Sequence, residues 1–363
     1  MILATDRITV RSTVEELIEV SKCIKNSYKS ILNKTMALLD TLKQIEEQRQ
    51  KSIPSKVFFN HFYAVNVHIQ SNIDKYNLKK ISFFNSLTLK NPTLDVDVIR
   101  KLLWNSWSTE YAFLLANQLD NDDYYRFSLH WNFPQAYYSV YLTMTAFHET
   151  QNVANEQHEK SIKIFGSSIK DNHYPSALSF YAAGMHNEFK FSGLQDFEHF
   201  PKDFNGLARV NSTIDAKIQI ASFLKSTRKK IAENKREKLE IAKDKRFFNK
   251  KGLFTQKFSA EHWNHIYKTI PETTILNLLY RLRIKANYHD VESFINAEID
   301  FKAFHESLGG IIDYLNFLHE AYIVKVIGIR AYEEILNKFP HKMNTETALK
   351  RYNERIKSLL VLK

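Results

Sequence analysis

The sequence predicts an all-α protein, and its composition supports this in three ways. Glycine accounts for only 8 of 363 residues and proline for 7, whereas glycine alone usually makes up about 7% of a protein. So little glycine and proline leaves few tight turns between strands. Residues that favour helices, such as Lys, Glu, Leu and Ile, are common. Hydrophobic residues form 44% of the chain, which is enough for a large core in one large domain or two ordinary ones.

Residues 12–50 are predicted to form one long helix. Ser12 and Glu15 have the spacing of a capping box at a helix start. An apolar residue then recurs every seven positions, at Leu17, Ile24, Ile31, Leu38 and Ile45. This apolar face suits packing against another helix, either as part of the core or in a self-associating coiled coil. We expect the helix to end before Pro54, because proline disfavours helical backbone at the residue before it.

The middle of the chain alternates between clear and unclear signals. Residues 55–90 contain aromatic runs without a clean period, which suit either short strands or helices buried on several sides. Residues 95–119 have helical spacing, and residues 120–123 are typical of a turn. We divide the chain into an N-terminal helical region (1–90), a helical domain (91–340) and a C-terminal helical tail (341–363).

Two amphipathic segments, ending near residues 151 and 166, are predicted to form an antiparallel helix pair. The first contains Pro134, which a first helical turn tolerates after a capping Asn132. Another segment is expected over 177–184, and residues 185–212 are expected to form an ordered loop. Further helices are predicted over 214–246, 261–270, 272–288 and 301–336, the last with a weak point at Gly309 and Gly310.

Much of the net charge of +11 lies between Lys225 and Lys251, where twelve cations and four acids give +8. A local basic stripe is the electrostatic signature of polyanion binding. The simpler interpretation is a solvated helix with i,i+4 ion pairs, such as Lys229 with Glu233. The predicted nucleic-acid-binding residues are Arg228, Lys229, Lys230, Lys235, Arg236 and Lys285.

Several other classes of site are disfavoured. Cys23 is the only cysteine, so the chain cannot form an internal disulfide or a cysteine-based metal cluster. His262 and His265 have an i,i+3 spacing but no supporting carboxylate pattern, and there is no nucleotide-binding glycine loop. We expect no metal and no cofactor. The start of the chain lacks the apolar run of a signal peptide, and no apolar stretch approaches the ~18 residues of a membrane span, so we expect a cytoplasmic protein.

Arg283 and His289 are the strongest candidate catalytic residues. Arginine is always charged and holds phosphate, and histidine transfers protons near neutral pH. Together they are sufficient for cleaving RNA without a metal, although such a pair is more often an ordinary surface feature. On one continuous helix the two side chains would lie about 120° apart. They would converge only if the helix ended between them or if a second subunit completed the site.

Two stretches together resemble the HEPN superfamily of all-helical domains, many of which are metal-independent ribonucleases. The first is Ala136–Tyr141, followed by Gln157-His158 and Phe165, and the second is Arg283–Asp290. This resemblance implies a HEPN-like helical bundle with a basic helical insertion at about 185–260. It also implies catalysis by Arg283 and His289, with Asn287 orienting either group, at a site that commonly forms in a homodimer.

The implied function is that of a toxin or phage-defence effector that cleaves RNA, with an antitoxin or defence-system protein as a possible partner. Asn287 stands where the family usually has an acidic residue, and many relatives with the tyrosine-type segment lack nuclease activity. The alternatives are a non-catalytic helical interaction protein and an RNA-binding module. We interpret His158 as a packing or capping residue and Arg126 as structural.

Overall fold

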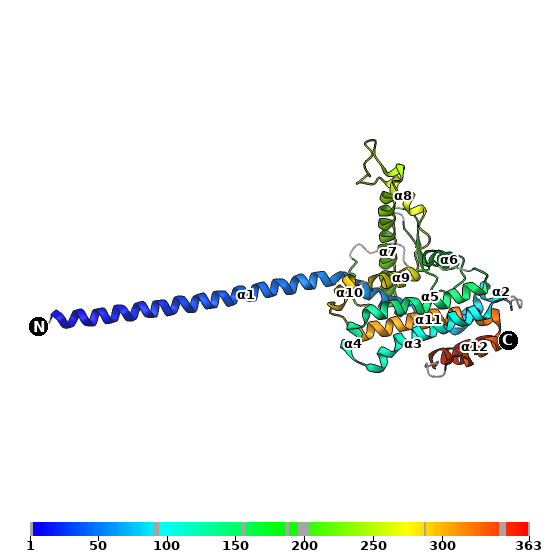
Figure 1. The fold of residues 1–363 in the computed structure, drawn as a ribbon, viewed down its shortest axis with the longest axis horizontal. Helices are drawn as coiled ribbons and strands as arrows, with labels where there is room; N and C mark the ends of the chain where they lie inside the picture. Colours follow the sequence, from blue (N-terminus) through cyan, green and yellow to red (C-terminus); the bar gives the residue numbers. More distant parts are fainter. Residues whose placement is uncertain are drawn as a thin grey trace. The chain divides into compact units, whose positions relative to one another are not determined.

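The computed structural model describes residues 3–89, 94–153, 157–185, 189–194, 204–286, 288–340 and 346–361, and it confirms the all-α prediction (Figure 1). The chain divides into two compact units, Met1–Ile53 and Pro54–Lys363. Residues 54–90, which the sequence groups with the N-terminal region, thus cluster with the second unit. No helix in the described ranges combines the length and the apolar character that crossing a bilayer requires.

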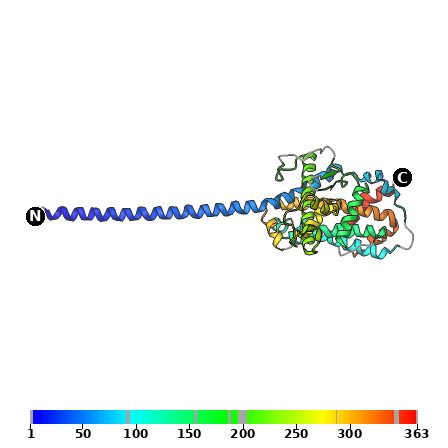
Figure 2. The same cartoon turned by 90° about the horizontal axis from the view of Figure 1, so that it is seen from above.

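Helix α1 extends from Leu3 to Asn72, so it begins before Ser12 and continues past Pro54 (Figure 2). Residues 3–11 contain no glycine or proline that would stop a helix. An internal proline costs about 3 kcal/mol. Beyond it, Phe59, Phe62 and Ile69 are fully buried, and each contributes roughly 1.5–3 kcal/mol. Burial therefore outweighs the proline, and the predicted end of the helix is corrected.

The heptad face of the Met1–Ile53 unit is exposed where its side chains are described. Ile31 is 63% exposed, Leu38 62% and Ile45 55%. The side chains of Leu17 and Ile24 lie outside the described residues. At these three positions the apolar face is exposed and does not form part of the core. The self-associating coiled coil remains a prediction.

The core of the second unit is built around α5 (Leu129–Thr150), which packs against α3 (Val96–Leu119), α9 (Ile275–Lys285) and α11 (Phe301–Ile327). α3 starts at a side-chain cap, because Asp95 accepts hydrogen bonds from the Asp97 and Val98 amides. Gly309 and Gly310 lie inside α11, and the break occurs instead at Gly328, which has a φ of 89°. Gly310 allows α11 to lie close to the Asn66 side chain of α1, because a Cβ at this position would come within 2.5 Å of Asn66 Oδ1.

The remaining elements complete the second unit. In chain order they are η1 (Lys75–Lys80), α2 (Ser82–Ser86), α4 (Asp122–Phe127), α6 (His158–Lys170), β1 (Tyr181–Ala183), β2 (Lys190–Ser192), α7 (Thr213–Ile241), η2 (Lys245–Phe247), α8 (Ala260–Lys268), α10 (Tyr288–Ile295), α12 (Ile329–Asn337), α13 (Glu346–Arg351), η3 (Tyr352–Ile356) and α14 (Lys357–Val361).

β1 and β2 form a small antiparallel sheet where the sequence predicts a helical segment and a loop, with Ala182 opposite Phe191. A long-range contact explains the difference. The Ala182 amide donates to the Thr273 carbonyl, and the Thr273 amide donates back to Ala182, both at 2.9 Å. The segment before α9 therefore holds β1 in an extended conformation, which local helix propensity cannot anticipate.

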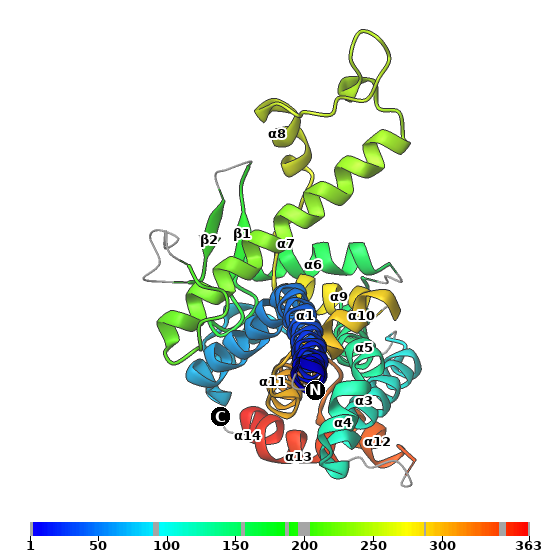
Figure 3. The same cartoon turned by 90° about the vertical axis from the view of Figure 1, so that its left-hand side faces the viewer.

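Figure 3 shows α6, α7, α8 and the two strands gathered on one side of the second unit. α7 is the predicted basic helix, and its inner end contributes Ile220, Phe223 and Leu224 to the main core. Its outer end packs with α8 around a smaller apolar cluster that includes Ala232, Phe247 and Ile266. The basic helix is therefore anchored at both ends by apolar contacts.

Candidate functional site

Helix α9 carries two arginines that face different sides. The helix starts at Thr274, whose backbone amide donates to the Asn277 side chain at 2.8 Å. Leu278, Leu279 and Leu282 are fully buried and fix the orientation of the helix. Arg281 and Arg283 are two positions apart, so their side chains diverge by about 200°.

Arg283 lies against a cluster of tyrosines from α5 and α9. Its Nε donates a hydrogen bond to the Tyr138 hydroxyl at 3.0 Å. Its guanidinium carbon lies 5.9 Å from the ring centre of Tyr137, 5.2 Å from that of Tyr138 and 5.8 Å from that of Tyr280. These are cation–π distances. No described carboxylate lies within ion-pair distance of Arg283, so its positive charge remains available to an anion.

His158, the first residue of α6, packs on the same tyrosines. Its Nδ1 lies 2.9 Å from the Tyr137 hydroxyl, and its ring centre lies 5.5 Å from that of Tyr137 and 5.9 Å from that of Tyr138. Burial, followed by the nearby charge of Arg283, lowers the pKa of His158. The histidine is thus packed and hydrogen-bonded, in agreement with our interpretation, but it also shares the cluster with Arg283.

The other two predicted catalytic residues are not located in the same detail. Asn287 and the side chain of His289 lie outside the described residues. The backbone shows that α9 ends at Lys285 and that α10 begins at Tyr288. Arg283 and His289 therefore belong to different helices, and the 120° separation expected on one continuous helix does not apply. Their catalytic pairing remains a prediction.

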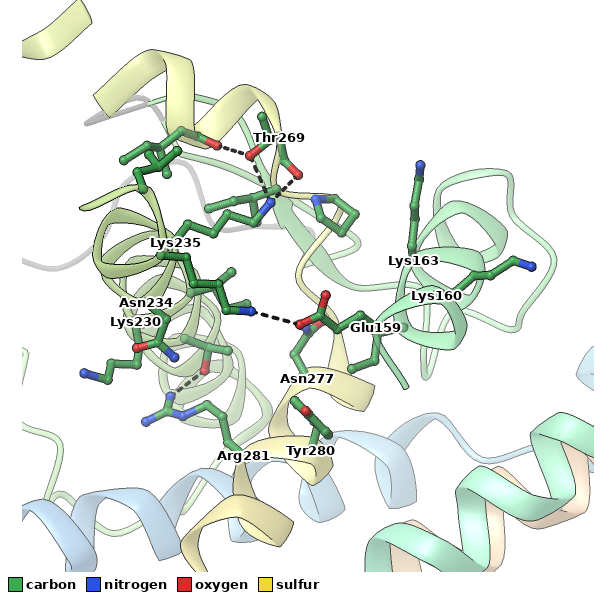
Figure 4. Close-up of a pocket in the computed structure, with 18 of the residues that line it drawn as sticks. Glu159, Lys160, Lys163, Lys230, Asn234, Lys235, Thr269, Asn277, Tyr280 and Arg281 are labelled. Atoms are coloured by element: carbon green, nitrogen blue, oxygen red, sulfur yellow. Dashed lines mark hydrogen bonds and ion pairs between the residues drawn. The ribbon is translucent and has the colours of Figure 1, made fainter. Parts of the chain in front are cut away.

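A pocket of about 880 Å³ lies between α6, α7, α8 and α9 (Figure 4). Seven cationic side chains and one carboxylate, Glu159, line it. The cations are Lys160, Lys163, Lys230, Lys235, Lys238, Arg246 and Arg281. Lys238 approaches Glu159 at 3.4 Å and so connects α7 to α6. Carboxylates outside the lining also pair with two of the cations, Glu233 with Lys230 at 3.5 Å and Asp244 with Arg246 at 2.7 Å. The remaining excess of positive charge favours an anionic ligand.

The predicted nucleic-acid-binding residues occupy different environments. Lys230 and Lys235 line the pocket, and Lys229 is exposed on α7. Arg236 donates to the Gln256 carbonyl at 2.8 Å and lies over Phe258 at 4.9 Å. Lys285 is partly buried at the end of α9. Lys235 Nζ donates to the Thr269 carbonyl at 2.8 Å and to its hydroxyl at 2.9 Å, and Lys230 forms an exposed ion pair with Glu233 at 3.5 Å. Lys229 and Lys230 are therefore the most accessible of these cations, whereas Lys235 also ties α7 to the segment after α8.

Arg228 does not have this role in the structure, because its side chain points inward and is 2% exposed. Its guanidinium donates to the Pro271 carbonyl at 2.8 Å and to the Gly184 carbonyl at 2.9 Å, which ties α7 to β1 and to the start of α9. The spacing offered a signal, since Leu224, Arg228 and Ala232 follow one another at i,i+4 on the buried face. The prediction for Arg228 is corrected accordingly.

Arg281 is a pocket residue that the sequence pattern does not single out. It is partly buried, and its Nη1 donates to the Thr227 hydroxyl at 2.5 Å. Its guanidinium carbon lies 5.2 Å from the Phe58 ring centre. Burial lowers the pKa of Arg281 to about 10. No described carboxylate pairs with it, and its place in an apolar helical run carries no signal of this environment.

The histidines considered as metal ligands have a local structural role. The Ser259 amide approaches His262 Nδ1 at 3.3 Å, so His262 takes part in the cap of α8. His265 lies one turn further along and borders the pocket. Across the described ranges, no three His, Cys, Asp or Glu side chains are grouped closely enough to hold a metal ion.

Comparison of the chain with protein-family models, with curated proteins and with solved structures gave no match.

Proposed function

We propose that this protein is a metal-independent endoribonuclease of the HEPN type. The observation that carries the proposal is Arg283, a cation that the tyrosines of α5 and α9 hold in place and that no described carboxylate neutralises. Of the segments that resemble the family, Ala136–Tyr141 belongs to α5, and the run from Arg283 begins in α9 and continues into α10; both α9 and α10 pack against α5. His158, which is also part of the resemblance, contacts the Tyr137 hydroxyl of α5 in the tyrosine cluster.

In the proposed reaction, His289 removes the proton from a ribose 2′-hydroxyl, and the 2′-oxygen forms a bond to the adjacent phosphorus. The bond from phosphorus to the 5′-oxygen breaks, and the departing oxygen takes a proton from water, which His289 restores by returning its own proton to the hydroxide that remains. The products are a 2′,3′-cyclic phosphate and a free 5′-hydroxyl. Arg283 stabilises the negative charge that builds on the phosphoryl oxygens, with Asn287 orienting either group.

The basic residues around α7 supply the attraction for RNA in this proposal. Lys229, Lys230 and Lys235 would bind phosphates, with Arg236 and Lys285 as further contacts. A second copy of the chain would complete the site, so the active form is a homodimer. The biological role would be that of a toxin or phage-defence effector, controlled by an antitoxin or a defence-system partner.

The test is cleavage of mixed RNA by purified protein in EDTA. We expect the parent and the matched control Arg330→Ala, an exposed arginine on α12, to produce cyclic phosphate ends. Arg283→Ala and His289→Ala should each lose about 10²–10⁴-fold in rate, the usual contribution of such groups. Equal cleavage by all four proteins would contradict the assignment of these residues.

A non-catalytic role in binding RNA is the second candidate, and the basic pocket favours it. In that case, the folded parent would bind RNA without cleaving it, and binding would weaken steeply with salt. His158→Ala belongs in the same experiment because His158 shares the tyrosine cluster with Arg283. Loss of cleavage in His158→Ala but not in His289→Ala would move the proton-transfer role to α6.

A further inference from the structure

We propose that the pocket between α6, α7, α8 and α9 binds a phosphate-bearing ligand of nucleotide size, with Arg281 and Lys230 as its anion-binding groups. This inference does not depend on RNA cleavage. It concerns a different face of α9 from the one that carries Arg283, and it would stand for a protein without nuclease activity.

Arg281 carries a charge that no described carboxylate compensates. Burying a cation is costly unless it is paired, and Arg351 shows how this chain pairs one: Glu110 and Glu320 approach its guanidinium within 3.0 Å. Arg281 has only the Thr227 hydroxyl and the Phe58 ring as described partners. The direction of its pKa shift, downward through burial, agrees with a missing counter-charge. An anion in the pocket would supply that charge.

The groups next to Arg281 are placed to share such an anion. Figure 4 shows Arg281 on the same side of the pocket as Lys230 and Asn234, so an arginine, a lysine and an amide line one side of it from α9 and α7. Lys230 forms an ion pair with Glu233 at 3.5 Å, but both side chains are 56% exposed, and such a surface pair contributes little, so a phosphate can replace it. Such a set provides several donors for phosphate oxygens. Lys160 and Lys163 point away from the pocket in the same view. They contribute to the local potential rather than to direct contacts.

The lining of the pocket is partly apolar as well as cationic. Ile231, Ile266 and Ile284 provide apolar surface, and Tyr280 adds an aromatic ring. The volume of about 880 Å³ lies within the range of about 300–1,000 Å³ that is usual for small-molecule sites. A ligand with a flat, weakly polar body and a charged phosphate matches both parts of the lining. A nucleotide has this chemistry, whether it is free or part of an RNA strand.

Isothermal titration calorimetry with the full chain would test the proposal, using ATP, adenosine and an uncleavable 2′-O-methyl RNA oligomer as probes. We expect ATP or the oligomer to bind at least tenfold more tightly than adenosine. Arg281→Met and Lys230→Ala should each weaken that binding tenfold or more. Lys230 is exposed, so its variant should fold even if Arg281→Met does not. Lys101→Ala, an exposed lysine on α3, is the matched control and should bind normally.

The probes also distinguish the source of the ligand. Binding of ATP without the oligomer would indicate a free nucleotide, and binding of the oligomer without ATP would indicate RNA. The proposal is overturned if neither probe binds the folded parent, if adenosine binds as tightly as ATP and the oligomer, or if Lys230→Ala binds like Lys101→Ala. If Lys230→Ala still cleaves RNA and any of these results is obtained, only the proposed phosphate-binding pocket is excluded. The nuclease proposal would then stand.

Discussion

Arg351 and Arg283 are both held by packed helices, but they differ in whether carboxyl groups pair with them. The Arg351 side chain is 1% exposed, and Glu110 and Glu320 approach it at 2.8 and 3.0 Å. Arg283 has the rings and one hydroxyl of the tyrosine cluster as described partners. The first arginine is paired with two buried carboxyl groups, and the second has no described carboxylate beside it. The proposal that Arg283 serves a ligand and Arg351 serves the fold rests on this difference.

The Arg351 cluster joins three distant parts of the second unit. Arg351 closes α13, Glu110 lies on α3 and Glu320 on α11. Trp107 Nε1 donates to Glu320 at 3.0 Å, and the Tyr332 hydroxyl donates to it at 2.9 Å. Removing one partner from a buried ionic cluster leaves the others uncompensated, which is usually more harmful than removing an exposed charge.

The largest effect should come from Arg351→Met. We expect it to lower the free energy of unfolding by about 3–5 kcal/mol, because two buried carboxylates would lose their cation. Arg283→Met should change it by less than about 1 kcal/mol, since no buried partner is left unpaired. Urea denaturation of the two variants measures the contrast. Similar decreases in the free energy of unfolding for both variants would contradict the view that Arg351 supports the fold more than Arg283 does.

A smaller effect should appear as a pH dependence at Glu110. Burial, together with the neighbouring Glu320, raises the pKa of Glu110 to about 7 from a usual 4.5, even though Arg351 opposes the shift. The folded state therefore binds the proton more tightly than the unfolded state. The stabilisation is fully present below pH 4.5 and is lost as the pH rises toward 7, by at most about 1.4 kcal/mol per pH unit.

Glu110→Gln removes this group and isolates its contribution. Burial lowers the pKa of His319 to about 3, and buried histidines of this kind make stability increase as the pH rises. The pH dependence of the parent alone would therefore not reveal the contribution of Glu110. The stability of the parent relative to Glu110→Gln should fall as the pH rises from 4.5 to 7. A difference that stays constant over this range would mean that Glu110 remains charged throughout.

The smallest effect concerns the exposed cations of α7. We expect Lys229→Ala with Lys230→Ala to weaken RNA binding about equally for all sequences. The slope of log K against log salt should decrease by about 0.7 for each phosphate of a single strand that the variant no longer neutralises. Lys101→Ala with Lys350→Ala removes two exposed charges elsewhere and should leave the slope unchanged. Equal slopes in both double variants would exclude Lys229 and Lys230 from the RNA interface.

Local sequence was sufficient where neighbouring residues decide the structure. The helical spacing of residues 95–119 and the basic run after residue 214 predicted α3 and the start of α7 closely, because apolar periodicity and capping act over a few residues. The predicted end of the basic helix at residue 246 is wrong, because α7 ends at Ile241 and Lys243 has a φ of 52°. Glycine and proline were less reliable as end signals. Pro54 and Gly310 lie inside helices whose long-range burial outweighs their local cost.

The sequence by itself determined that the chain is helical, that its positive charge is concentrated on one helix, and that Arg283 follows an apolar run. Only the tertiary structure decided which cations are available to a ligand. Arg228 is turned inward by the carbonyls before α9, whereas Arg281 lies in a pocket without a described carboxylate beside it. The physical reason is that the free energy of a charge depends on its burial and on its partners, and those partners come from segments far apart in the chain.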